Sequence, residues 1–249
     1  MLSDNEFLRY SRQLLLEEVG IEGQQALSQA SVLIVGLGGL GSPAALYLAA
    51  AGVGRLWLAD DDDLHISNLQ RQILYRSAET GQSKAQLAQQ HLQALNPHIT
   101  LEVLTRRMDE ETLVAALRDV DLVLDCSDNM STRQAVNAAC VCFNRPLVSA
   151  SVVGFSGQLL VLLPPWQQGC YHCLWADESE PQRNCRTAGV LGPVAGVMGT
   201  LQALEAIKLL SGQPSPLAGK LRLFDGREQT WRTLNLQANA QCPVCGGGV

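Results

Sequence analysis

The stretch SVLIVGLGGLGSPAALYLAA, residues 31–50, determines the fold class of this chain. Its first five residues form a short apolar run typical of a buried strand, and the segment after Pro43 is rich in the helix formers Ala and Leu. Between them, Gly36, Gly38, Gly39 and Gly41 fit the pattern G-x-G-x-x-G. Glycine at these positions lets the chain turn tightly and lets backbone N–H groups at a helix N-terminus approach a phosphate. The stretch predicts a strand–turn–helix unit that binds a nucleotide; the alternative is a turn that needs glycine only for packing.

The alternation of strands and helices continues along the first half of the chain. Strands are expected at 55–59, 99–104, 122–124 and 147–151, and helices at 83–95, 110–117 and 131–143. Such alternation implies a parallel sheet with helices on both faces. Beyond residue 151 the strands expected at 158–163, 220–224 and 230–236 follow one another, the last two across the turn Asp225-Gly226. The prediction is an α/β fold with a Rossmann-like, mainly parallel sheet extended by antiparallel strands.

Residues 1–30 are expected to form a helical arm. Ser3 and Glu6 make a capping-box pattern ahead of a run of leucines, and the helical pattern is interrupted near residues 20–23. No internal repeat and no Gly/Ser linker divides the sequence. We therefore expect a single domain over residues 1–249, with the arm at 1–30, a nucleotide-binding half at 31–151 and a second half at 152–249.

Composition excludes several classes of protein. The 18 Lys and Arg residues against 24 Asp and Glu give a net charge of −6, and only 5% of the residues are aromatic, which argues against a nucleic-acid binder. The longest apolar stretch, residues 188–210, contains Pro193, Gln202, Glu205 and Lys208, which indicates a buried helix and no membrane span. Eight cysteines are too few for a disulfide scaffold, and the N-terminus lacks a signal-peptide pattern, so a reducing cytoplasm is expected.

Polar residues follow the strands whose carboxyl ends should meet beside the glycine turn. The candidates for nucleotide binding are Asp60, Asp62, Ser67, Asn68, Arg71, Gln72, Lys84, Asp128 and Asn129. Asp60 would hold ribose hydroxyls, Arg71 and Lys84 would flank phosphates, and Asp128 would hold Mg²⁺. Cleavage of a triphosphate needs such cations because charge develops on phosphate oxygens, whereas a nicotinamide site does not. The cluster favours ATP over NAD, with an NAD-dependent oxidoreductase as the alternative.

Two C-x-x-C pairs lie far apart in the sequence, at Cys170 and Cys173 and at Cys242 and Cys245. Together they supply four thiolates for a closed tetrahedral Zn²⁺ site without a catalytic position. Two separate redox pairs are the alternative. Cys185 is different, because it follows Arg183 in a polar stretch where a lowered thiol pKa and a nucleophilic role are plausible.

Taken together, these motifs resemble the HesA/MoeB/ThiF family of adenylyltransferases, which are related to ubiquitin-activating enzymes. The similarity runs from Arg9 to Cys245 and rests on the glycine turn, residues 67–72, Lys84, residues 125–129 and the paired C-x-x-C motifs. Residues 59–63, 184–189 and 199–208 are most similar to the branch that acts on the sulfur carrier of thiamine synthesis. The branch of molybdopterin synthesis is the alternative.

The resemblance implies an activity, partners and residue roles. The C-terminal carboxylate of a ubiquitin-like sulfur carrier ending in Gly-Gly would attack the α-phosphate of ATP, and a persulfide donor would later supply sulfur. Asn68, Arg71 and Lys84 would contact the phosphates, and residues 152–249 would bind the carrier and zinc. Arg12 from the arm of a second subunit would complete the site, which implies a homodimer. Cys185 matches a cysteine that forms an acyl-disulfide with the carrier.

The resemblance leaves two further functions open. A related branch activates the carboxylate of a small molecule or of a tRNA, and a zinc-stabilised scaffold would bind a partner without consuming ATP. The acidic composition weakens the tRNA reading.

Overall fold

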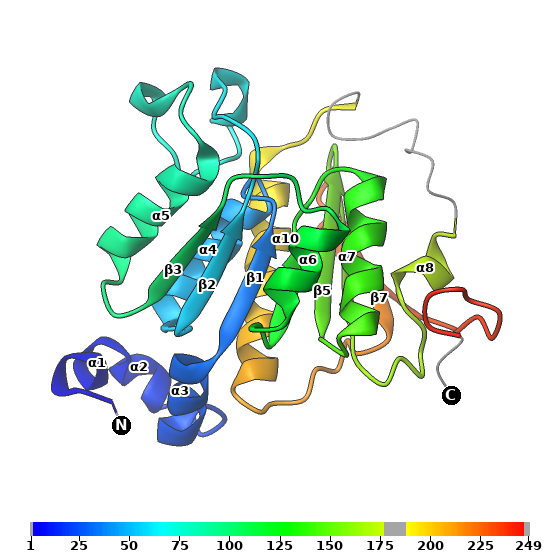
Figure 1. Cartoon of the computed structure of the whole chain (residues 1–249), viewed down its shortest axis with the longest axis horizontal. Helices are drawn as coiled ribbons and strands as arrows, with labels where there is room; N and C mark the ends of the chain where they lie inside the picture. The colour runs from blue at the N-terminus through cyan, green and yellow to red at the C-terminus, as the bar shows by residue number, and fades with distance from the viewer. Residues whose placement is uncertain (1, 177–187, 247–249) are drawn as a thin grey trace.

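A single mixed sheet organises the molecule (Figure 1). The computed structural model describes residues 2–176 and 188–246, and within them the strand order of the eight-stranded sheet is β3-β2-β1-β4-β5-β6-β7-β8. The strands are β1 (Ser31–Val35), β2 (Arg55–Ala59), β3 (Thr100–Leu104), β4 (Leu122–Asp125), β5 (Leu147–Val153), β6 (Ser156–Leu162), β7 (Lys220–Asp225) and β8 (Thr230–Asn235). Strands β1 to β5 pair in parallel and β5 to β8 pair antiparallel. The fold class predicted from the sequence is confirmed.

Helices cover both faces of the sheet. They are α1 (Asp4–Arg9), α2 (Ser11–Leu14), α3 (Gly20–Gln29), α4 (Gly41–Ala51), α5 (Lys84–Leu95), α6 (Glu110–Leu117), α7 (Met130–Cys142), α8 (Tyr171–Leu174) and α10 (Gly192–Leu210). Helices α4, α5 and α10 pack on one face, and α6 and α7 on the other (Figure 1). Side chains alternate between the two cores along β1: Val32 and Ile34 join the first, and Leu33 and Val35 the second. This is why residues 32–35 are all apolar.

The predicted strands and helices are confirmed to within two residues at most boundaries. Two local features differ. The hairpin between β7 and β8 turns through residues 226–229, so Asp225, expected in the turn, instead ends β7 opposite Thr230. In the arm, the interruption lies between α2 and α3, at residues 15–19, and Gly20 begins α3 with a φ of +54°. Gly23 lies inside α3, where a Cβ would come within 3.2 Å of Ser211 Cβ, so this glycine permits close packing and does not break the helix.

The arm lies at the amino ends of the strands, because α3 ends at Gln29 and β1 begins at Ser31. Asn96 Nδ2 donates to Tyr10 Oη at 2.8 Å, and Arg9 Nη1 donates to the carbonyl of Leu95 at 3.1 Å. These bonds fix the arm against the end of α5. Among the described residues, no helix is both long enough and apolar enough to cross a membrane.

Candidate functional site

A cavity of about 1210 Å³ opens at the carboxyl ends of the central strands. Most of its lining residues belong to the loops that follow the strands, and Figure 1 shows these loops and the helical arm at opposite ends of the strands. Nearly all of the nucleotide-binding residues expected from the sequence line it: Gly36, Gly38, Gly39, Asp60, Asp62, Ser67, Asn68, Arg71, Gln72, Lys84, Asp128 and Asn129. Gly41 stands behind the turn and does not line the cavity. The topology thus gathers residues from the three segments that follow β1, β2 and β4.

The glycines of the turn serve two different purposes. Gly36 has a φ of +90°, and a Cβ on Gly41 would lie 1.9 Å from the carbonyl oxygen of Gly36, so these two residues allow the turn itself. A Cβ on Gly38 would meet only Gln72 Nε2, at 3.5 Å. Gly38 therefore leaves space in front of the backbone, as close approach of a phosphate requires.

This difference yields a paired prediction. Gly41→Ala is expected to lower the free energy of unfolding by about 3 kcal/mol, or roughly 10 °C in Tm, because backbone atoms must move. Gly38→Ala is expected to keep the Tm and to weaken ATP binding about tenfold, because the methyl group fills the space beside the backbone. Thermal unfolding and calorimetric titration with ATP measure the two effects. Equal losses of stability in both variants would contradict this division.

Asp60 and Lys84 form the polar base of the cavity. The Asp60 carboxylate accepts from the backbone N–H groups of Leu37 at 2.7 Å and Asp62 at 2.9 Å. Burial raises the pKa of Asp60, and the nearby Lys84 ammonium opposes that rise. Lys84 Nζ lies 2.8 Å from Asp62 Oδ2 and 3.9 Å from Asp60 Oδ1. Asp60 therefore orients the glycine turn, and a carboxylate with about four lone-pair positions still has acceptor capacity for a ligand hydroxyl.

The segment after β2 presents the next group of polar side chains. Arg71 is half-buried, and its Nη1 donates to the carbonyl of Ser67 at 3.0 Å. Asn68 Oδ1 accepts from the His65 N–H at 3.0 Å, which fixes the short turn. Gln72 Oε1 is a buried acceptor without a hydrogen-bond partner among the described residues. Because buried polar atoms are normally satisfied, this oxygen indicates a donor supplied by a ligand or water.

The loop after β4 carries Asp128 and Asn129 into the cavity. Asp128 is exposed there, while Asn129 Oδ1 accepts from the Thr132 N–H at 2.9 Å and so caps α7. Beneath the loop lies a buried arginine, Arg133, paired with Asp125 at 3.2 Å. Sequence reasoning missed Arg133; its only signal is a charge on a helix face that is otherwise expected to be buried.

Sequence reasoning also missed Arg106 and Arg107, which line the cavity from the loop after β3. Two predicted residues do not join this cavity. Arg12 is exposed on α2, at the opposite edge of the sheet, and no lining residue among those described comes from the arm. Cys185 lies outside the described residues.

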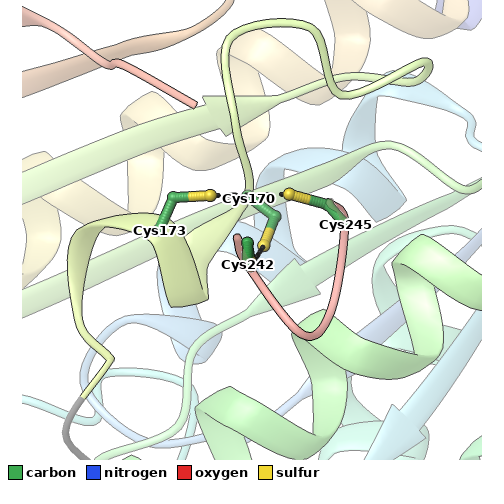
Figure 2. A group of neighbouring side chains, drawn as sticks. All are labelled: Cys170, Cys173, Cys242 and Cys245. Atoms are coloured by element: carbon green, nitrogen blue, oxygen red, sulfur yellow. Dashed lines mark hydrogen bonds between the residues drawn. The ribbon is translucent and has the colours of Figure 1, made fainter. Parts of the chain in front are cut away.

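The four cysteines of the C-x-x-C pairs meet beside α8, as Figure 2 shows. Their Sγ atoms all lie within 4.8 Å of one another, with 3.8 Å between Cys170 and Cys242 and 3.4 Å between Cys173 and Cys245. Tetrahedral bonds of about 2.3 Å to Zn²⁺ would place sulfurs about 3.8 Å apart, so the set fits this ion.

Hydrogen-bond donors lie around the cysteine cluster, although burial raises the pKa of the Cys170 and Cys245 thiols. Asn137 Nδ2 lies 3.5 Å from Cys170 Sγ, and the Asn239 N–H donates to Cys173 Sγ at 3.4 Å. Burial opposes ionisation of Cys242, but backbone N–H groups of Cys245 and Val244 outweigh it, and the pKa of the Cys242 thiol falls to about 7. The cluster can therefore hold a cation and join the C-terminal tail to α8.

Comparison with known proteins identifies the family. Residues 10–244 match the ThiF family. This chain belongs to the ThiF family. The family expected from the glycine turn, the residues that follow it and the cysteine pairs is thus confirmed. The match spans the cavity and three of the four clustered cysteines, and it ends one residue before Cys245.

Several relatives of this ThiF-family chain have names. It is 62% identical over 246 residues to the sulfur carrier protein ThiS adenylyltransferase of Escherichia coli K12, which covers 99% of this chain and 98% of that protein. It is 44% identical to the molybdopterin-synthase adenylyltransferase of Salmonella typhimurium, over 98% of each. The solved structure of E. coli MccB with ATP superposes with a TM-score of 0.83 at 26% identity, covering 96% of this chain and 74% of that one.

Proposed function

We propose that this chain uses ATP to adenylate the C-terminal glycine carboxylate of a ThiS-like, ubiquitin-like sulfur carrier, with release of pyrophosphate. The product would be the activated form from which the carrier thiocarboxylate for thiamine thiazole synthesis is made. The observation that carries the proposal is the 62% identity to the E. coli ThiS adenylyltransferase along essentially the whole of both chains. A cavity that gathers Arg71, Lys84 and Asp128 around a glycine turn suits this chemistry.

The reaction places two anions in contact. A carboxylate oxygen of the carrier forms a bond to the α-phosphorus of ATP, the bond from that phosphorus to the bridging oxygen breaks, and pyrophosphate leaves. The carboxylate is already ionised at pH 7, so no general base is needed. Arg71 and Lys84 offset the repulsion and the charge that develops on the phosphates. Lys84, paired with Asp62 at 2.8 Å, transfers its hydrogen bonds to a phosphate when ATP binds.

Mg²⁺ and Zn²⁺ have separate places in this proposal. Asp128 would hold Mg²⁺, which supplies charge neutralisation at the phosphates when bound. The carboxylates of Asp60, Asp61 and Asp62 also lie within 4.8 Å of one another, but Lys84 already pairs with two of them, Asp60 and Asp62. Cys170, Cys173, Cys242 and Cys245 would hold Zn²⁺ with no open coordination position, so the ion would be structural.

A homodimer is part of the proposal, with Arg12 of one subunit completing the cavity of the other. Support comes from the arm, which carries exposed apolar side chains at Phe7, Leu8, Leu15 and Leu16 next to Arg12. Several exposed large apolar side chains on one short arm are typical of a protein–protein interface. They favour an arm that packs on a second copy of the chain.

Subunit mixing tests the shared site. Arg12→Ala and Arg71→Ala are each expected to be inactive alone, because every site in either homodimer lacks one arginine. After subunit exchange, half of the dimers contain both variants and one of their two sites is intact, so about one quarter of the wild-type rate should return. Exchange that is complete by native mass spectrometry but restores no activity would place Arg12 outside the shared site.

Later steps complete the proposed pathway. The terminal sulfur of a persulfide donor would attack the acyl carbon of the carrier adenylate, AMP would leave, and carrier and donor would be joined by an acyl-disulfide. Thiol–disulfide exchange would then transfer the carrier to Cys185 as an acyl-disulfide and release the donor thiol, and an external thiol would reduce this bond to give the carrier thiocarboxylate. Residues 152–249 would contact the carrier. The cytoplasm is the proposed compartment, because it supplies ATP and keeps thiolates reduced.

Exchange of labelled pyrophosphate into ATP tests the adenylation step. Purified protein with Mg·ATP is incubated alone, with the thiamine-pathway carrier, or with the molybdopterin carrier. Exchange that depends on the thiamine carrier is the expected result. Exchange only with the molybdopterin carrier would support carrier adenylation but assign it to molybdopterin synthesis. Exchange with neither carrier would overturn the proposal. A parallel NADH fluorescence titration is expected to show no binding.

A further inference from the structure

The guanidinium group of Arg133 is buried at the floor of the cavity, although nothing in the adenylation chemistry above uses it. The residue is 7% exposed. Nη1 donates to Asp125 Oδ2 at 3.2 Å, to Ser149 Oγ at 3.2 Å and to the carbonyl of Ala150 at 2.9 Å. Nη2 donates to the carbonyl of Ser127. One side chain of α7 thus satisfies acceptors from three different segments.

These acceptors surround the loop that presents Asp128. Asp125 ends β4, Ser149 and Ala150 belong to β5, and Ser127 directly precedes Asp128. Asp125 also binds the loop directly, because its Oδ1 accepts hydrogen bonds from the Ser127 N–H at 3.1 Å and from Ser127 Oγ at 2.6 Å. Arg133 and Asp125 therefore fix Ser127 from both its N–H and its carbonyl.

The other side of Asp128 is fixed as well, since Asn129 caps α7 through the Thr132 N–H. Asp128 therefore lies between two anchored residues. The backbone on either side of it has little freedom, and the carboxylate is presented to the cavity from a defined position.

Burying this charge has a cost that an apolar core would avoid. Burial lowers the pKa of Arg133, but the ion pair with Asp125 outweighs that effect and holds the pKa above its ordinary value, so the guanidinium stays charged. Replacing a buried ion pair with apolar side chains is often neutral or stabilising. A fully satisfied polar network fixes one geometry where an apolar contact would allow several. The value of Arg133 therefore lies in the geometry that it imposes.

We propose that Arg133 is a positioning residue of the nucleotide site, which holds the loop after β4 so that Asp128 meets the metal ion of Mg·ATP. The inference deepens the proposed function, on which it rests through the role of Asp128. It predicts that Arg133 acts on the metal-bound nucleotide specifically and that its whole effect passes through Asp128.

Arg133→Lys keeps the positive charge but removes the two-pronged guanidinium group, which donates to β5 through Nη1 and to the carbonyl of Ser127 through Nη2. Calorimetric titration of the intact protein with ATP, once with Mg²⁺ and once with EDTA, measures the effect. We expect the variant to bind Mg·ATP about tenfold more weakly, the size of one lost hydrogen bond to a charged group, and to bind metal-free ATP as the wild type does. Arg145→Lys is the matched control, because Arg145 donates to the carbonyls of Leu117 and Arg118, away from the cavity.

A double-mutant cycle tests the dependence on Asp128. Asp128→Asn is expected to weaken Mg·ATP binding, and adding Arg133→Lys to it should cause no further loss. Additive losses, or equal losses for Mg·ATP and metal-free ATP, would overturn the inference and leave a purely structural arginine. If Arg133→Lys does not fold, Ser149→Ala removes two bonds of the network, one from Arg133 and one to Asp125, while leaving the Arg133 fork in place. It should show a smaller change of the same kind, and no change would also overturn the inference.

The two proposals fail in different ways. Pyrophosphate exchange by the wild type tests adenylation of the carrier and does not involve Arg133 variants. Wild-type protein that shows no exchange with either carrier, yet a Mg²⁺-specific loss in Arg133→Lys, would reject the carrier and keep the positioning role. Exchange by the wild type with the thiamine carrier, together with no Mg²⁺-specific loss of ATP binding in Arg133→Lys, would keep the carrier and reject the positioning role.

Discussion

Arg71→Ala is expected to abolish adenylation, with the rate of pyrophosphate exchange falling about 10³-fold while the fold is retained. The side chain lines the cavity and makes one hydrogen bond, to the carbonyl of Ser67 in its own turn. Its removal therefore leaves no buried charge unpaired, and the Tm should change by less than about 2 °C. The variant loses the Arg71 guanidinium, a cation placed where negative charge on the phosphates increases in the transition state.

Lys84→Ala provides the informative comparison. It is expected to lose exchange to the same extent, but this lysine is buried and pairs with Asp62 and Asp60. Without it the pKa of the buried Asp60 carboxyl rises further and the Tm should fall by about 5 °C. Lys220→Ala is the control for a lost positive charge, because Lys220 Nζ donates to the carbonyl of Pro216 and does not line the cavity formed by the described residues. Unchanged pyrophosphate exchange in Arg71→Ala or Lys84→Ala would remove that residue from the proposed site.

Loss of the metal at the cysteine cluster is the second large effect. Zinc analysis of the wild type is expected to find one ion per chain. Cys242→Ser, or treatment with a strong chelator, should lower the Tm by more than about 10 °C, because the binding energy of a structural zinc is part of the folding energy. The C-terminal tail should then become sensitive to protease. ATP binding should survive, because none of the four cysteines of the cluster lines the cavity.

Cys142→Ser is the matched control, since Cys142 is an exposed cysteine on α7 that belongs to no cluster among the described residues. It should leave both zinc content and Tm unchanged. A wild-type protein that contains no metal and two disulfides would contradict the assignment. So would a metal-bound protein whose Tm does not respond to chelation.

Much of the fold was predictable because local patterns determined it. Residues 32–35 are apolar because β1 is buried on both faces. The turn requires glycine at position 36, where φ is +90°, and at position 41, where a Cβ would lie 1.9 Å from the carbonyl oxygen of Gly36. The arm was less predictable. The pattern around Gly20 and Gly23 indicated a break, but Gly23 is needed for contact with Ser211 after α10, which no local pattern reveals.

The residues of the cavity were also predictable where local patterns decide, and not where long-range contacts decide. Residue types and their place after successive strands predicted which side chains would gather, because parallel strands bring their carboxyl ends to one edge. Which side chains bond to one another was not predictable. Lys84 pairs with Asp62, Asn129 caps α7, and Gln72 keeps an unpaired oxygen, and each of these outcomes depends on distances set by packing.

The sequence by itself determined the family, the alternation of strands and helices, and the residues that could hold a nucleotide and a metal. It could do so because the glycine turn, the hydrophobic periodicity and the C-x-x-C pairs are local patterns, each contained within a short segment of the chain. Only the tertiary structure decided that Cys170 meets Cys242 at 3.8 Å, that Arg12 faces the edge away from the cavity and that Arg133 supports the loop of Asp128. These contacts join segments far apart in the chain, and they form only where the packing of sheet and helices brings charged and polar groups within bonding distance.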